Sequence, residues 1–174
     1  LIDPFLMKDI VKAIDGIWAA IEKGQKITVY GDYDVDGVTS VCTLYLYLKA
    51  LGADVNYYIP NRAGEGYGVS VAAIDAIAEE GTKLIVTVDT GTTAVDEVEY
   101  AKSLGIDFII TDHHECRSDL PDALAVINPH RPDCEYPFKE LAGVGVVFKL
   151  ICAYEERILG RKRRDAAISI FNRF

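Results

Sequence analysis

The stretch "KITVYGDYDVDGVTS", residues 26–40, joins a β-branched apolar run to three alternate aspartates and a glycine. The apolar run predicts a buried strand, and the residues after the glycine are typical of a helix. Three carboxylates this close repel one another and raise each other's pKa values unless a cation lies among them. The stretch therefore predicts a strand, a turn that could bind a metal ion, and a helix.

The alternation of strand-like and helix-like segments continues along the chain. Strands that alternate with helices form right-handed βαβ units. We expect one α/β domain over residues 1–174, with a mostly parallel, Rossmann-like sheet between two layers of helices. The sequence pattern predicts strands at 26–31, 54–60, 83–89, 106–112 and 123–129, and helices at 3–23, 37–52, 70–81, 94–105, 143–159 and 161–174.

The composition is typical of a globular domain. The chain has 174 residues, of which 50% are hydrophobic, and this length allows one domain with a real core. No apolar run has the length of a membrane span, and the first residues carry charges where a signal peptide needs an apolar stretch. Because the chain does not begin with methionine, we expect its first residue to lie inside a longer protein. The four cysteines form no CxxC pair, which favours reduced thiols and a cytoplasmic protein.

Charge is distributed unevenly along the chain. Residues 1–154 contain 12 Lys and Arg against 24 Asp and Glu, whereas residues 155–174 contain 6 against 3. A self-sufficient nucleic-acid-binding domain normally shows a basic surface, which most of this chain lacks. A polyanionic substrate would have to be attracted by bound cations, by a few placed basic residues, or by a further part of the protein.

Acidic residues and histidines follow three of the predicted strands, as "DYDVDG", "DTG" and "DHHE". In open parallel sheets ligands bind beyond the carboxyl ends of the strands, so these side chains should meet at one edge. Their oxygen and nitrogen donors suit Mn²⁺, or Mg²⁺ where oxygen dominates, and a carboxylate can bridge two ions. The candidate residues are Asp34, Asp36, Asp89, Asp112, His113 and His114.

Three other interpretations of residues 32–37 are weaker. The pattern D-x-D-x-D-G matches the start of a calcium loop, but its twelfth position is Thr43 instead of glutamate. The segment "DVDGVT" resembles haloacid-dehalogenase-type phosphatases, with Asp34 as nucleophile and Asp36 as acid, but "TDHHE" stands where that family needs other acidic residues. A solvated acidic turn that caps a helix would explain one aspartate and not three.

The motifs "GDYDVDGVTS", "VTVDTG" and "TDHHE", in this order, resemble the DHH phosphoesterase superfamily. The segments "YYIPNR", "EGYG" and "INPHRPDCEYPFKELAGVGVVFKL" extend the resemblance over most of the chain, toward the catalytic core of bacterial exonucleases specific for single-stranded DNA. The resemblance implies phosphodiester hydrolysis from the 5′ end with two Mn²⁺ or Mg²⁺ ions, in DNA repair and recombination. It also implies single-strand-binding protein or other repair proteins as partners of a full-length form.

The resemblance implies a set of metal ligands. Asp34, Asp36 and His113 match residues that bind metal, and Asp89 matches an aspartate that can bridge both ions. Asp32 is a further candidate, because it could partly replace a metal-binding histidine that one branch of the superfamily has four residues before Asp34.

The resemblance also implies catalytic and substrate-binding residues. His114 matches the histidine that faces the scissile phosphate, and Asp112 matches a residue that orients a neighbouring histidine. Arg62 is a candidate for binding a terminal 5′-phosphate, because a guanidinium group matches phosphate oxygens bidentately. The alternative for Arg62 is a surface ion pair with a nearby glutamate. His130 and Arg131 are candidates for facing the substrate, with a loop-stabilising role as the alternative.

Two parts of the family pattern have no match in these residues. The fourth motif is an aspartate after the long helix, and Asp165, in a basic stretch, fits it poorly. The second, glycine-rich substrate-binding domain is also without a match. We therefore expect the 174 residues to fold and to be nearly inactive alone. Two alternatives stay open: a phosphodiesterase that acts on short oligonucleotides or cyclic dinucleotides, and a non-catalytic scaffold that binds partners or DNA.

Overall fold

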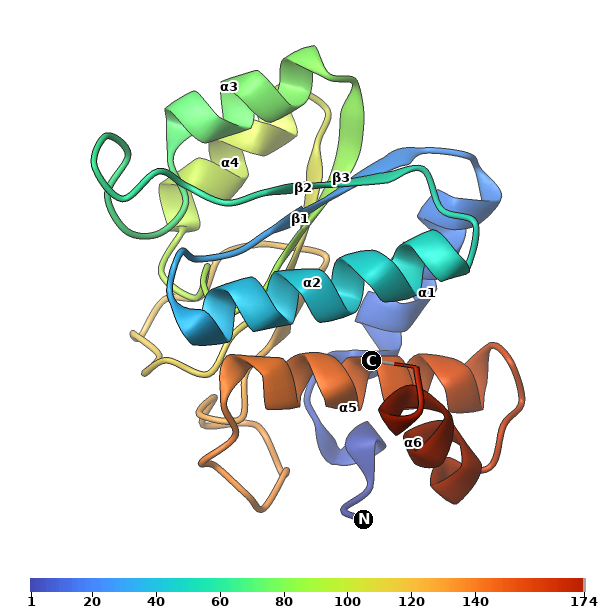
Figure 1. Ribbon diagram of the computed structural model, residues 1–174. Helices are drawn as coiled ribbons and strands as arrows, with labels where there is room; N and C mark the ends of the chain where they lie inside the picture. Colours follow the sequence, from blue (N-terminus) through green and yellow to red (C-terminus); the bar gives the residue numbers. More distant parts are fainter. Residues whose placement is uncertain (174) are drawn as a thin grey trace.

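The structure, a computed structural model, describes residues 1–173 and is built around one parallel sheet (Figure 1). The sheet has five strands in the order β2-β1-β3-β4-β5, and every adjacent pair is parallel. The predicted α/β fold is confirmed. The strands are β1 (Lys26–Tyr30), β2 (Val55–Tyr58), β3 (Thr82–Thr87), β4 (Asp107–Thr111) and β5 (Ala125–Ile127).

Helices cover both faces of the sheet and bury two apolar cores. Helices α1 and α2 cover one face, and α5 packs against both of them, whereas α3 and α4 cover the opposite face (Figure 1). Helix α6 packs against α5. The helices are α1 (Ile10–Glu22), α2 (Val35–Ala50), α3 (Val71–Glu79), α4 (Val95–Ser103), α5 (Gly143–Arg157) and α6 (Arg163–Phe171), preceded by the 3₁₀ turn η1 (Pro4–Leu6).

The predicted helix at 3–23 is interrupted. The chain forms η1, breaks, and starts α1 only at Ile10, because Asp9 adopts a left-handed conformation with a φ of 66°. The carboxylate of Asp9 accepts hydrogen bonds from the backbone N–H of Val126 and from Arg131, at 3.1 and 2.8 Å. These long-range bonds favour the break over a continuous helix. The prediction for the last helix extends to Phe174, which lies outside the described residues.

The strand order creates a crevice at one point of the sheet. From β1 the chain crosses through α2 to β2 at the edge, and then returns through α3 to β3 on the other side of β1. The carboxyl ends of β1 and β3 therefore lie where the direction of winding reverses. In doubly wound sheets with this strand order, ligands bind at that switch point.

No helix within residues 1–173 has both the length and the apolar character needed to span a lipid bilayer. Helix α1, for instance, buries only one side, which contacts β1 and β5 as well as α5.

Candidate metal centre

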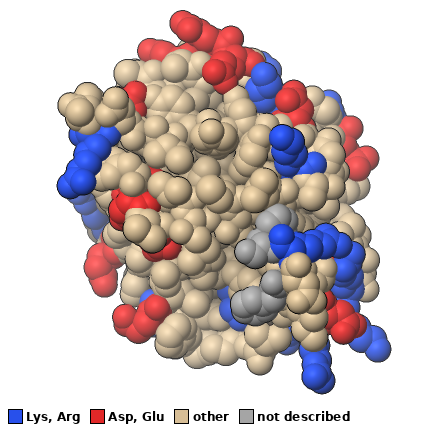
Figure 2. Space-filling model, viewed as in Figure 1, with Lys and Arg blue, Asp and Glu red and all other residues tan. Residues whose placement is uncertain are grey.

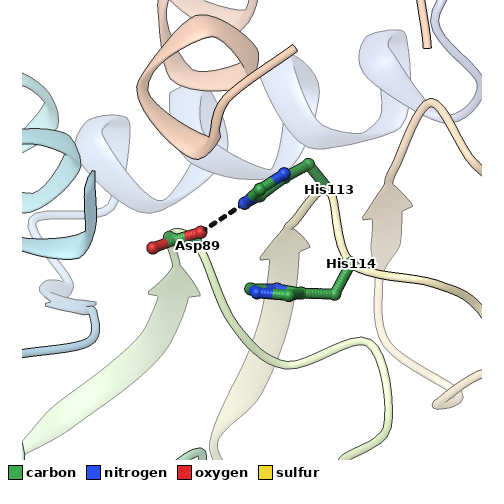
Figure 3. A group of neighbouring side chains, drawn as sticks. All are labelled: Asp89, His113 and His114. Carbon is green, nitrogen blue, oxygen red and sulfur yellow. Dashed lines mark hydrogen bonds and ion pairs between the residues drawn. The ribbon is translucent and has the colours of Figure 1, made fainter. Parts of the chain in front are cut away.

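Three strand ends deliver carboxylates and imidazoles to the crevice. Ligand atoms of Asp32, Asp34 and Asp89 all lie within 4.8 Å of one another. Asp89 also belongs to a second group of the same tightness, with His113 and His114. Figure 3 shows that Asp89 comes from the end of one strand and the two histidines from the end of its neighbour. Asp89 is thus shared by two potential ligand sets.

The turn after β1 holds its aspartates by local hydrogen bonds. Asp34 is the N-cap of α2, and its Oδ1 accepts from the backbone N–H of Gly37 at 2.8 Å. Asp32 is buried; its Oδ1 accepts from the N–H of Tyr33 at 2.7 Å, whereas Oδ2 is buried without a partner among the described residues. Glycine is needed at position 37, because a Cβ there would lie 2.5 Å from the carbonyl oxygen of Asp32.

Asp36 is held by the start of α5. Its two oxygens accept from the backbone N–H groups of Gly143 and Val144, at 2.7 and 2.9 Å. The positive end of a helix dipole stabilises a carboxylate in this position. Oδ2 of Asp36 lies 3.4 Å from Nε2 of His113, so Asp36 lies beside the second ligand group without belonging to either group.

Asp89 is the most constrained of these residues. It is buried and adopts a left-handed conformation with a φ of 58°. Its Oδ1 lies 2.7 Å from Nε2 of His113 (Figure 3). Burial, followed by the charges of Asp36 and Asp34, raises the pKa of Asp89 to about 8. A like-charge cluster in a buried place gives this shift when no cation is present.

The histidine loop is organised by Asp112, which is buried. Its Oδ1 accepts from Nδ1–H of His114 at 2.6 Å and from the N–H of His113 at 2.8 Å, and its Oδ2 accepts from the N–H of Thr92 at 3.0 Å. Burial pushes the pKa of Asp112 upward, but the bonds from His114 and Thr92 outweigh it, and the pKa lies below its usual value. The bond to Asp112 raises the pKa of His114 to about 9. Nε2 of His114 faces the hydroxyl of Tyr67 at 3.0 Å.

The arrangement fits divalent cations. Oδ2 of Asp32 is buried without a hydrogen bond, and burial raises the pKa of this carboxyl group. A cation among Asp32, Asp34 and Asp89 would give that oxygen a partner and remove the repulsion between the carboxylates. Carboxylate oxygens with an adjoining imidazole are a donor set that suits Mn²⁺ and Mg²⁺.

The residues expected to bind substrate lie in different surroundings. Arg62 is exposed, and its guanidinium carbon lies 5.5 Å from the ring centre of Tyr33, within the metal-site turn. Within residues 1–173 no ion pair joins Arg62 to Glu65, whose carboxylate accepts from Tyr58 and from the N–H of Asn61. The surface ion pair is therefore not what the structure contains.

His130 and Arg131 make internal contacts. Arg131 pairs with Asp9 and Asp133, both at 2.8 Å, and donates to the carbonyl oxygen of Val126. Nδ1 of His130 bonds to the carbonyl oxygen of His113. These contacts support the loop-stabilising alternative for both residues.

Sequence reasoning assigned no role to Tyr67, Thr92 or Asn128. All three contact the histidine loop, through His114 or Asp112. Tyr67 and Asn128 lie in the quoted segments "EGYG" and "INPH", but nothing in either segment shows that its polar group turns toward residues 112–114. Their roles depend on which strands lie side by side.

The family model described as "DHH family, N-terminal domain" matches residues 26–169. The chain belongs to the DHH family. The matched region contains every candidate ligand, from Asp32 in the turn after β1 to His114 in the loop after β4.

Relatives of this DHH chain include bacterial exonucleases. It is 55% identical over 148 residues to the single-stranded-DNA-specific exonuclease RecJ of Bacillus subtilis. The matched region is 85% of this chain and 19% of that protein. A crystal structure of exonuclease RecJ bound to manganese has a TM-score of 0.80 at 35% identity, over 95% of this chain and 43% of that one. RecJ of Thermus thermophilus, in complex with Mn²⁺, has a TM-score of 0.74 at 33% identity, over 94% of this chain and 24% of that one. The chain therefore spans less than half the length of these relatives.

Proposed function

We propose that the protein hydrolyses single-stranded DNA from the 5′ end, releasing 5′-mononucleotides, with two Mn²⁺ or Mg²⁺ ions as cofactors. The observation that carries the proposal is the position of Asp89, which belongs to both groups of ligand atoms. A carboxylate with two oxygens can contact two cations at once, and paired cations are suited to in-line displacement at phosphorus. The similarity to RecJ exonucleases, two of them solved with manganese, supports the same chemistry.

Two groups of residues in the chain would each bind one cation. Asp32, Asp34 and Asp89 would hold one ion, and Asp89 with His113 would hold the second, beside Asp36. Bound divalent cations supply activation of a water molecule and neutralise the charge of the phosphoryl group. Asp36, fixed by the N-terminus of α5, would keep the ring of His113 turned toward Asp89.

His114 would act on the scissile phosphate. Asp112 fixes the proton on Nδ1 of His114, so that Nε2 points toward the open side of the site and Tyr67. The bond to Asp112 raises the pKa of His114, which favours the protonated imidazole. A positive imidazolium can stabilise charge that develops on the phosphate, or give a proton to the leaving oxygen. The role of Asp112 would be to orient this ring.

The surroundings of His114 leave space for a nucleotide. A hollow of about 290 Å³ is lined by Tyr67, by the segment 90–94 and by His114. Arg62, exposed and over the ring of Tyr33, would grip a terminal 5′-phosphate through its guanidinium fork. A strand end bound by Arg62 would place its first phosphodiester bond near the cations.

The test is an exonuclease assay on the full gene product with 3′-labelled single strands. We expect shortening from the 5′ end that needs Mn²⁺ or Mg²⁺ and stops with EDTA. Outer-shell groups around a metal typically matter by about 10- to 100-fold, so Asp89→Asn, a ligand change, should cost more than roughly 100-fold. The control Asp54→Asn alters an exposed aspartate before β2 and should keep full activity.

The same assay tests the 5′-phosphate site. Arg62→Ala should lower the ratio of rates on 5′-phosphorylated and 5′-hydroxyl strands, whereas Arg117→Ala, at another exposed arginine, should leave the ratio unchanged. An unchanged ratio in the Arg62 variant would mean that the phosphate is held elsewhere. Hydrolysis restricted to dinucleotides or cyclic dinucleotides, or no metal-dependent hydrolysis at all, would contradict the exonuclease proposal.

The cellular role proposed for this activity is DNA repair and recombination in the cytoplasm, with single-strand-binding protein or other repair proteins as partners. The four free cysteines are consistent with a reducing compartment. Similarity to RecJ supports single-stranded DNA as the substrate.

A further inference from the structure

We propose that Asn128 is a positioning residue that fixes the backbone of the His113–His114 loop and so sets the geometry of the metal centre. The proposal rests on the proposed function only for its effect on catalysis, since its effect on cation binding is independent of the substrate. Asn128 follows β5, the edge strand beyond the histidine loop, and touches neither a candidate ligand side chain nor the open crevice.

The amide of Asn128 is fully buried and fully bonded. Its Nδ2 donates to the carbonyl oxygen of His114 at 2.8 Å and to Oγ1 of Thr92 at 3.0 Å. Its Oδ1 accepts from the backbone N–H of His130 at 2.8 Å. Both N–H groups and the oxygen therefore have partners, so no polar atom of this buried amide lacks a hydrogen bond.

The partners leave only one orientation for this amide. The carbonyl oxygen of His114 can only accept, and the backbone N–H of His130 can only donate. Turning the amide over would place Oδ1 against the oxygen of His114 and Nδ2 against an N–H. Asn128 is thus locked between two backbone groups of opposite kind.

Two neighbours of Asn128 fix the rest of the histidine loop by further hydrogen bonds. The backbone N–H of Thr92 donates to Oδ2 of Asp112. Nδ1 of His130 bonds to the carbonyl oxygen of His113 and must carry the proton, because a carbonyl only accepts. Residues 112, 113 and 114 are consequently each tied to the loop after β3 or the loop after β5.

The histidine loop needs these hydrogen bonds because it has no regular structure of its own. Strand β4 ends at Thr111, and the following residues form no helix or strand up to β5. His113 must nevertheless direct Nε2 at Asp89, and His114 must keep Nδ1 on Asp112. Ligands need positions fixed to within about 0.5 Å for metal binding and catalysis, and surrounding hydrogen bonds provide this precision.

The test compares Asn128→Asp with a matched control in the full gene product. Aspartate has the same shape but presents only oxygens, so it would repel the carbonyl of His114 and leave Thr92 without its donor. We expect affinity for Mn²⁺, measured by calorimetry without DNA, and kcat on single-stranded DNA each to fall by roughly 10- to 100-fold. KM should stay within twofold. The control is Asn56→Asp, since Asn56 bonds to Thr28 and Glu80 and to no residue of the site.

A purely structural role would give a different pattern. In that case Asn128→Asp would lower the melting temperature as Asn56→Asp does and keep Mn²⁺ affinity and kcat within twofold below the transition, which would overturn the proposal. If Asn128→Asp does not fold, Thr92→Val decides, because it removes one acceptor of the amide and keeps the backbone N–H on Asp112. A loss of Mn²⁺ affinity in Thr92→Val that Thr92→Ser does not show supports the positioning role of Asn128. Unchanged Mn²⁺ affinity in Thr92→Val overturns it.

Failure of the proposed function would be visible separately. If the unaltered protein binds Mn²⁺ but does not cut DNA, the exonuclease proposal fails, and the calorimetric comparison of Asn128→Asp with Asn56→Asp still decides the role of Asn128.

Discussion

At the scale of single residues, Asp89 concentrates the constraints of the site. Its left-handed backbone conformation costs of the order of 1–3 kcal/mol in a residue with a Cβ, and such strain persists where the surroundings enforce it. Gly143 lies close against this residue, since a Cβ there would meet the carboxylate oxygen of Asp89 at 2.8 Å. The glycine thus allows α5 to begin directly against the metal centre.

The variant Gly143→Ala should damage the site more than the fold. The new methyl group must displace Asp89 or the first turn of α5. The first movement shifts a candidate ligand, and the second loosens the bonds from the helix to Asp36. Overpacking of this kind costs about 1–3 kcal/mol of stability. Mn²⁺ affinity, measured by calorimetry, should fall by roughly 10-fold or more, as for other groups that orient ligands.

Gly145→Ala is the matched control for that variant. A Cβ at Gly145 meets only the side chain of Leu141, at 3.1 Å, which can shift slightly. Its Mn²⁺ affinity should equal that of the unaltered protein. Equal affinities in both alanine variants would show that the contact between Gly143 and Asp89 has no role in the centre.

The part of this site that the sequence predicts is the set of acidic residues and histidines at the strand ends. Asp34, Asp89 and His113 follow apolar runs, so their meeting at one edge could be predicted from the parallel sheet alone. Asn128 could not be recognised in the same way, because its partners Thr92 and His114 are 36 and 14 residues away. A buried amide in a loop carries no local signal of which backbone groups it will meet.

At the scale of elements, the N-terminus of α5 and the loop after β5 both support the centre. The helix contributes two N–H groups to Asp36, and the loop contributes Asn128 and His130. The same loop is anchored to the start of α1 by the pair between Arg131 and Asp9, whose side chains are only 10% and 12% exposed. The ion pair connects the first helix to the segment that carries Asn128.

The variant Arg131→Met tests whether this arginine is structural. Removing one partner of a buried pair leaves the other charge uncompensated, and the cost here should approach about 3 kcal/mol. For a domain of this size that lowers the melting temperature by roughly 6–12 °C. KM for single-stranded DNA, measured below the transition, should not change. A raised KM at unchanged stability would instead place Arg131 on the substrate.

Lys8→Met provides the comparison on the same surface. Lys8 lies 4.0 Å from Asp133 with about half of its side chain exposed, and exposed pairs contribute at most about 1 kcal/mol. Its melting temperature should change little.

Helix and strand positions followed from periodicity wherever local preference and tertiary contacts agree. Strand β3, for example, was expected at 83–89 and spans Thr82–Thr87. The exception is the break before Ile10, which depends on hydrogen bonds from Val126 and Arg131 to Asp9. Bonds between residues more than a hundred positions apart leave no periodic pattern, so the break could not be read from residues 3–23.

At the scale of the whole molecule, basic and acidic side chains gather over different helices. Basic side chains gather at the lower right of Figure 2, over α6, whereas acidic side chains dominate the upper rim over α3. Two of the arginines near α6 are already paired, Arg161 with Glu155 and Arg163 with Asp3. The metal centre lies at the opposite end of α5, where Gly143 contacts Asp89. The cations of α6 are therefore not placed to hold a DNA strand at the site.

This separation leads to a prediction for residues 1–174 by themselves: they should fold but bind cations weakly and cut DNA poorly. The described residues form a five-stranded sheet with an apolar core on each face, and we expect this burial to suffice for folding. Asp165 is the residue considered above for the fourth motif of the family pattern. It is exposed in the first turn of α6, beyond the end of the 15-residue helix α5 that is far from the metal centre. A helix of that length spans about 22 Å, far more than a metal–oxygen distance of about 2.0–2.6 Å.

Calorimetric titration with Mn²⁺, combined with the exonuclease assay, checks this prediction on the 174-residue chain and on the full gene product in parallel. We expect weaker Mn²⁺ binding, a much lower rate and a low DNA affinity for the shorter chain, because an acidic surface offers few contacts to phosphates. Thermal unfolding of the same sample establishes that it is folded. If the 174 residues bind two ions tightly and degrade single strands as fast as the full product, the ligands described around Asp89 are sufficient. An Asp165→Asn variant with unchanged Mn²⁺ affinity would then exclude α6 as the source of a further ligand.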